Sequence, residues 1–167
     1  GWGRCVMATV IRGDDNFDTA VTGVLLSGEA RNEGSTGTGS AVDMASLSLN
    51  LTGFAGKRLI AQGSTGITES ANTANASILR LHLNNGSSTI VIGALRSGVP
   101  HGGDFGGNSV DPYTVDCVYI IPSSHATTCT LKLNGGLDAG TFRYGNQNNY
   151  SHFDGENAGC VLTYFVI

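Results

Sequence analysis

The segment with the richest binding chemistry runs from Tyr144 to Phe153 and mixes amide with aromatic side chains. Each amide offers both hydrogen-bond donors and acceptors, and aromatic rings stack on the apolar faces of sugars. A variable surface loop shaped only by local turn chemistry would have the same composition. The functional reading predicts a receptor- or glycan-binding loop that uses Tyr144, Asn146, Asn149, Tyr150, His152 and Phe153.

Catalytic chemistry has little support in this sequence. An enzyme needs a nucleophile beside a base, or a pair of carboxylates that can act as acid and base. The carboxylates Asp104, Asp154 and Glu156 fall in polar, Gly-containing stretches and form no recognisable motif. We therefore expect no catalytic residues, and a polysaccharide hydrolase that uses these three carboxylates remains a minor alternative.

Metal binding is also weakly supported. Asp14, Asn16 and Asp18 alternate as in a calcium loop, but the required Gly and distal Glu are missing. Single loop histidines such as His101, His125 and His152 are usually solvated, although they could meet on the axis of a trimer. We expect no metal and no cofactor.

Four cysteines occur, Cys5, Cys117, Cys129 and Cys160, and none belongs to a C-x-x-C pair. The last three lie inside apolar strand patterns, where buried free thiols act as small hydrophobic side chains. A Cys117–Cys129 bridge is the alternative, and it requires Cα atoms within about 7 Å.

The composition indicates one domain rich in short strands. Hydrophobic residues make up 40% of the 167 residues and charged residues only 13%, against a usual charged share of about 25%. The net charge of −4 and the scattered basic residues give no support to nucleic-acid binding. No apolar run reaches the ~18 residues of a membrane span, and no signal peptide is visible, so we expect no membrane insertion.

The hydrophobic pattern predicts strands and no helix. Residues 45–51 and 77–83 alternate between apolar and polar side chains, as half-buried strands do. Asn84-Asn85-Gly86-Ser87 is a hairpin turn that leads into residues 89–95. Residues 29–40 and 63–76 contain little to bury and are predicted as exposed loops, the first of them a flexible arm. About eight to ten short strands in two antiparallel sheets is the size of a jelly roll.

The closing stretch, residues 160–167, is apolar on both faces of the predicted strand. Cys160, Leu162, Tyr164 and Val166 point one way, and Val161, Thr163, Phe165 and Ile167 point the other. One face can pack in the core of this chain. Because the chain has little material for a further layer, we expect another subunit to cover the second face.

Two segments resemble a known family. Residues 78–93 resemble a hairpin common in tail- and head-fibre proteins of tailed bacteriophages. Residues 118–133 and 139–144, followed by the closing strand, are similar to the final segments of the same proteins, although Cys129 and Leu131 depart from the pattern. The resemblance implies a TNF/C1q-like jelly-roll sandwich over residues 42–167 that assembles as a homotrimer. Residues 1–41 would supply N-terminal strands and an arm or attachment segment, and Tyr119, Tyr164 and Phe165 would pack near the axis.

These observations lead to a functional hypothesis. The chain is expected to be a non-enzymatic virion protein, a trimeric fibre, spike or capsid-decoration domain assembled in the host cytoplasm. Its partners would be itself, other capsid or tail proteins and a host cell-surface polysaccharide. The alternative is a secreted lectin or C1q/TNF-like ligand-binding module, which a Cys117–Cys129 disulfide would favour.

Overall fold

The computed structural model describes residues 24–32, 34–38, 41–69, 76–97, 111–137, 141–145 and 159–167. These residues form strands and one short 3-10 turn, η1 (Ser123–His125). The described part of the chain contains no helix long and apolar enough to cross a membrane. The strands are β1 (Leu26–Asn32), β2 (Gly34–Thr38), β3 (Val42–Asn50), β4 (Arg58–Glu69), β5 (Ser77–Asn84), β6 (Thr89–Ser97), β7 (Asp111–Ile120), β8 (Thr128–Leu137), β9 (Thr141–Gly145) and β10 (Cys160–Val166).

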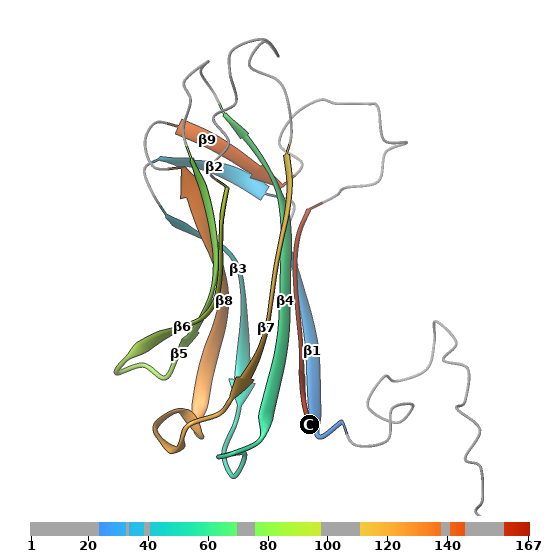
Figure 1. The fold of residues 1–167 in the computed structure, drawn as a ribbon, viewed down its shortest axis with the longest axis vertical. Helices are drawn as coiled ribbons and strands as arrows, with labels where there is room; N and C mark the ends of the chain where they lie inside the picture. Colours follow the sequence, from blue (N-terminus) through green and yellow to red (C-terminus); the bar gives the residue numbers. More distant parts are fainter. Residues whose placement is uncertain are drawn as a thin grey trace, which may run out of the picture.

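The strands build two antiparallel sheets that pack face to face (Figure 1). The larger, six-stranded sheet has the order β1-β10-β4-β9-β2, and β7 pairs with the other edge of β4. The smaller, four-stranded sheet has the order β3-β8-β5-β6. The predicted all-β, two-sheet antiparallel sandwich is therefore confirmed.

The core lies between the sheets and is filled by side chains that alternate along each strand. In β5 every second residue is buried, and in β10 the same alternation holds. The largest fully buried side chains are Phe142, Met44, Leu49, Leu51, Leu59, Leu79, Leu81, Leu83, Ile121, Leu131, Leu133 and Leu137.

The predicted hairpin is confirmed, since β5 and β6 pair from Ser77↔Ser97 to Asn84↔Thr89. Oδ1 of Asn85 accepts hydrogen bonds from the backbone N–H groups of Ser87 and Ser88, at 2.9 and 2.7 Å. Gly86 adopts a φ of 87°, which a side chain would disfavour.

The prediction of an exposed arm over residues 29–40 was wrong, because β1 and β2 are strands of the larger sheet. Two glycines in these strands face aromatic residues across the ladder: Gly28 pairs with Tyr164, and Gly37 pairs with Phe142. A Cβ atom at Gly28 would lie 2.7 Å from the Tyr164 ring, so the ring fills the space that a side chain would need. The aromatic residues supply the apolar contact that the polar strands lack.

The loop predicted over residues 63–76 was also wrong in part, because β4 continues to Glu69. Gly63 is buried in this strand, and a Cβ atom there would lie 2.4 Å from Cδ1 of Leu133 in the opposite sheet. The glycine therefore permits close approach of the two sheets and does not end the strand.

Candidate subunit interface

The last strand, β10, lies in the interior of the larger sheet between β1 and β4. Its inner face is buried, as predicted, with Leu162 and Val166 fully enclosed. On its outer face Val161, Thr163 and Phe165 are half-buried, and Ile167 after the strand is 39% exposed. The second face is thus only partly covered by the described residues.

Apolar side chains from three strands meet on this outer face in one row. Phe165 of β10 pairs with Ile60 of β4, and Ile60 pairs with Val118 of β7. Paired residues project on the same face of a sheet, so these three side chains are neighbours. Val118 is 67% exposed.

A second row lies beside the first, toward the chain terminus. Ile120 pairs with Arg58, and Arg58 exchanges backbone hydrogen bonds with Ile167. Leu25 continues the outer face of β1 at this end, because it lies two residues before Ser27, which pairs with Phe165. Its N–H donates to the carbonyl of Val166 at 2.8 Å. Ile120 and Leu25 are 53% and 48% exposed.

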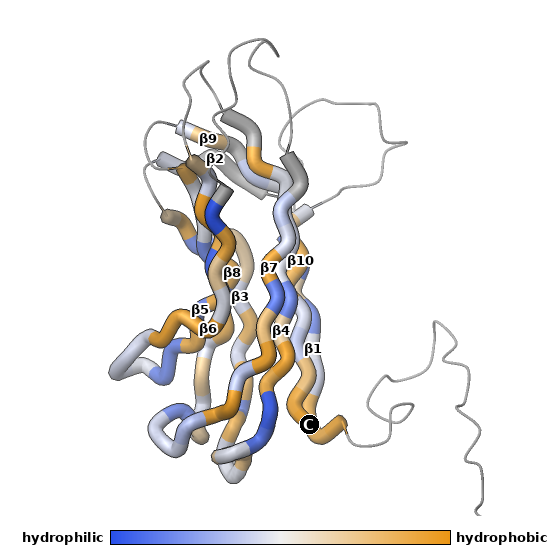
Figure 2. The backbone as a smooth tube through the Cα atoms, viewed as in Figure 1, coloured by the Kyte–Doolittle hydropathy of each residue, from blue (hydrophilic) through white to orange (hydrophobic). Residues whose placement is uncertain are grey.

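Together these residues define an apolar patch that Arg58 interrupts in its second row: Leu25, Ile60, Val118, Ile120, Phe165 and Ile167. Figure 2 shows hydrophobic stretches of β4, β7 and the chain terminus gathered in the lower half of the larger sheet. Single exposed apolar residues are normal on soluble proteins, but a contiguous group marks a site of contact.

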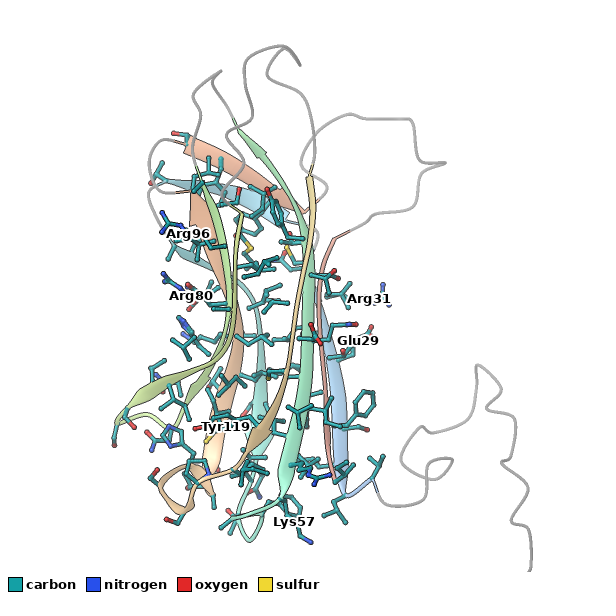
Figure 3. All side chains as sticks on the ribbon, viewed as in Figure 1. Glu29, Arg31, Lys57, Arg80, Arg96 and Tyr119 are labelled. Carbon is teal, nitrogen blue, oxygen red and sulfur yellow. The ribbon has the colours of Figure 1, made fainter. Side chains whose placement is uncertain are left out.

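Polar residues border the patch. The next row along the strands joins Asp116, Gln62, Thr163 and Glu29 in register. Glu29 forms an exposed ion pair with Arg31, and Figure 3 shows both side chains on the outer side of the larger sheet, with Lys57 at its lower end. An apolar centre with a polar border is the anatomy of a protein–protein interface.

The structure separates the three residues predicted for the subunit interface. Phe165 belongs to the apolar patch. Tyr164 instead points into the sandwich and is only 4% exposed, so its side chain has almost no surface left for a partner. Tyr119 pairs with the fully buried Leu59, and therefore also lies on the inner side of its strand, half-buried. The alternation of the strands corrects the expectation for Tyr164, whereas the expectation for Tyr119 stays a prediction.

Val118 and Ile120 were missed for a simple reason. The segment from residue 115 to 121 is apolar on nearly both faces, so its pattern does not reveal which face is inner. Its pairing with β4 decides the matter, because Cys117 faces Ala61, which is buried in the core.

The predicted recognition loop is largely outside the described residues, which exclude Asn146, Asn149, Tyr150, His152 and Phe153. Tyr144, the remaining member, is 7% exposed and packs beside Phe142 with ring centroids 6.1 Å apart. Its ring is a core side chain, and the expectation that it stacks on a sugar is corrected.

The cysteines of the described residues, Cys117, Cys129 and Cys160, are free thiols. Burial raises the pKa of each thiol above its usual value. Cys160 also lies 2.9 Å from the hydroxyl of Thr65 inside the core. Raised pKa values leave these thiols protonated and poorly nucleophilic.

His125, expected as a solvated loop histidine, is buried in η1 and only 2% exposed. Its Nδ1 atom lies 3.1 Å from the hydroxyl of Ser124. Within the described residues no three His, Cys, Asp or Glu side chains are placed to hold a metal. The other candidate ligands and carboxylates lie outside those residues: Asp14, Asn16, Asp18, His101, Asp104, Asp154 and Glu156.

Comparison with known proteins adds little. No family of known sequences matches the chain, and no curated protein does. One similar solved structure contains the CBM22-1 and GH10 modules of Clostridium thermocellum xylanase 10B with xylohexaose; it is 14% identical, with a TM-score of 0.39, over 78% of this chain and 21% of that one. Another is infectious bursal disease virus, Gx strain, 12% identical with a TM-score of 0.37, over 85% of this chain and 38% of that one.

Proposed function

We propose that this chain is a virion structural protein, a trimeric fibre, spike or capsid-decoration domain. The observation that carries the proposal is the apolar patch on the outer face of the larger sheet. A second copy of the chain that covers Val118, Phe165 and their neighbours would remove these side chains from water, at about 25 cal/mol per Å² of apolar area. Such burial would favour association of the chain with itself.

The strand pairing supports a jelly roll. Leaving aside the short β2 and β9, the eight remaining strands pair first with last, second with seventh, third with sixth and fourth with fifth. This is the pattern of a long antiparallel hairpin rolled into two sheets, as in jelly rolls of capsid proteins. The resemblance of residues 78–93 and 118–144 to phage fibre proteins points the same way.

A trimer is the proposed assembly. A three-fold ring uses a heterologous contact, in which the apolar patch of one copy covers a different surface of the next. Such a ring closes on itself and leaves no copy with an uncovered patch.

The alternative is a secreted lectin or C1q/TNF-like ligand-binding module. The free thiols of Cys117 and Cys129 favour the virion protein, because secreted domains of this size commonly carry disulfides. Host glycan binding by the loop of residues 145–153 remains part of the proposal under either alternative.

Purified virus particles provide the test. If the locus that carries this gene produces particles, the protein should sediment with them through a density gradient and survive a wash at high salt. Mass spectrometry of the particle fraction should then count copies in multiples of three. Particles that contain none of this protein would contradict the virion role, whatever the oligomeric state of the isolated chain.

A further inference from the structure

The outer face of the smaller sheet carries a second feature, a cluster of polar side chains centred on β8. Asn134 of β8 pairs with Asp43 of β3 on one side and with Arg80 of β5 on the other. In the next outward-facing row along the strands, Lys132 pairs with His82. We name these five residues the polar cluster; they come from three strands that are far apart in the sequence.

Asp43 organises one half of the cluster. Nζ of Lys132 donates to one of its carboxylate oxygens at 2.6 Å, and Nδ2 of Asn134 donates to the other at 2.9 Å. Burial alone would raise the pKa of Asp43, but these hydrogen bonds outweigh burial and hold the pKa below its usual value. The carboxylate is therefore ionised and the amide of Asn134 is fixed in orientation, with its oxygen turned away from Asp43.

The other half of the cluster is incomplete. Two buried atoms, Oδ1 of Asn134 and Nε2 of His82, have no hydrogen-bond partner within the described residues. Asn134 is only 8% exposed, so water does not readily replace the missing partner. Buried polar atoms are nearly always paired in folded proteins, so each exception needs an explanation, such as an ordered water or a bound ligand.

The backbone is irregular in two of the strands that carry the polar cluster, β3 and β5. The pairing of β3 with β8 shifts register between Asp43 and Ala45, and the pairing of β5 with β6 shifts between Leu81 and His82. The first bulge is secured from the opposite sheet, where Nδ2 of Asn32 donates to the carbonyl of Met44 at 2.6 Å. Bulges re-aim side chains and concentrate beside binding sites.

The face also has a local positive charge in a chain whose net charge is −4. Arg80 and Lys132 outnumber Asp43 in the cluster, and Arg96 projects from the same face because it pairs with Ile78 of β5. Figure 3 shows Arg80 and Arg96 pointing away from the sandwich on one side. The described strands of this sheet carry no Phe, Tyr or Trp, so a ligand here is held by charge and hydrogen bonds and not by stacking.

We propose that this face binds an acidic polysaccharide. A carboxylate or sulfate of the sugar chain pairs with Arg80 and with the N–H groups of Lys132 that do not donate to Asp43. As Arg80 turns toward this acidic group, it leaves room for sugar hydroxyls to donate to Oδ1 of Asn134 and to bond to Nε2 of His82. Hydroxyl and amide side chains in the following row, Ser48, Thr130 and Asn84, extend the contact along the sheet. The site lies within one chain, so it does not depend on the proposed trimer or on the virion role.

Titration calorimetry of the full chain tests this inference with three probes: a short oligogalacturonate, a heparin-derived oligosaccharide and a neutral malto-oligosaccharide of similar length. We expect binding of at least one acidic probe and none of the neutral one. The double variant Arg80→Gln, Lys132→Gln should weaken binding about tenfold or more, since two charge-assisted hydrogen bonds are lost. The single variant Arg80→Gln should weaken binding less than the double variant does. If the double variant does not fold, the single variant replaces it in the test.

The matched control is Arg31→Gln, Lys57→Gln, which removes the same charge from the side of the larger sheet (Figure 3). It should leave the affinity within about twofold, because neither residue belongs to the polar cluster and salt screens exposed charges that do not touch the ligand. The proposal is overturned if neither acidic probe binds, or if the control weakens binding as much as the cluster variant does. It is equally overturned if the neutral probe binds as tightly as the acidic ones.

Discussion

Val118→Asp is the substitution that separates association from folding most clearly. Val118 is 67% exposed in the single chain, so an aspartate there costs the isolated fold little, within about 0.5 kcal/mol. In the proposed assembly the same position lies within the contact. There an aspartate would lose most of its contact with water.

The size of the effect follows from two contributions. Burial of a whole valine side chain is favourable by roughly 1.5–3 kcal/mol, and about two-thirds of that is still available at Val118. Removal of a carboxylate from water adds a penalty of several kcal/mol. Even a loss of about 3 kcal/mol per contact weakens association roughly 100-fold.

Analytical ultracentrifugation across a dilution series measures the change, and thermal unfolding reports on the fold. The control is Thr114→Asp, an equal change of charge on the outer face of the same strand, in the polar row opposite Ser64. Thr114→Asp should associate like the original chain, whereas Val118→Asp should sediment as a monomer. If both variants dissociate alike, or if neither does, the apolar patch is not the contact.

Three further predictions concern the core and the polar cluster. Gly63→Ala should destabilise the fold by about 1–3 kcal/mol, because the added Cβ would lie 2.4 Å from Leu133. In a double-mutant cycle measured by chemical denaturation, Leu133→Ala should destabilise the Gly63→Ala variant less than it destabilises the original chain. If the two losses of stability simply add, Gly63 and Leu133 are not closely packed. Burial, assisted by the charge of Arg80, holds the pKa of His82 below its ordinary value of 6.5. The stability that neutral His82 contributes is therefore present above about pH 6.5. It is lost as the pH falls toward the lowered pKa of the folded state. Arg80→Gln should raise the pKa of His82 in an NMR titration, and an unchanged pKa would place the two side chains apart. Cys160 should react with a thiol reagent only as fast as the protein unfolds, because it is fully buried and its pKa is raised by burial; rapid labelling of the native protein would contradict that burial.

The features that sequence reasoning predicted share a strong local signal. Residues 77–95 combine alternation with an Asn-Gly turn, and both strands and the turn were found as predicted. The inward face of β10 followed from alternation alone. Apolar periodicity and turn chemistry are properties of neighbouring residues, so they can be read without the fold.

The features that it missed depend on contacts between distant segments. Gly28 and Gly37 look like loop residues until Tyr164 and Phe142 are placed across from them. Gly63 looks like a strand end until Leu133 of the opposite sheet is placed against it.

The apolar patch and the polar cluster also differ in how far each could be predicted from the sequence. The expectation of a partner came from the apolar residues of the last strand, but the membership of Val118 in the apolar patch depended on the register of β7 against β4. The polar cluster had no sequence signal, because Asp43, Arg80 and Lys132 are isolated charges that only the order of the smaller sheet brings together.

The mass of the unmodified chain in solution tests the central claim most directly. Sedimentation equilibrium at micromolar concentration should give three times the 17.2 kDa of one chain, and the mass should fall only on strong dilution. A mass of 17.2 kDa that does not change with concentration would mean that the apolar patch stays in water, and it would contradict this account.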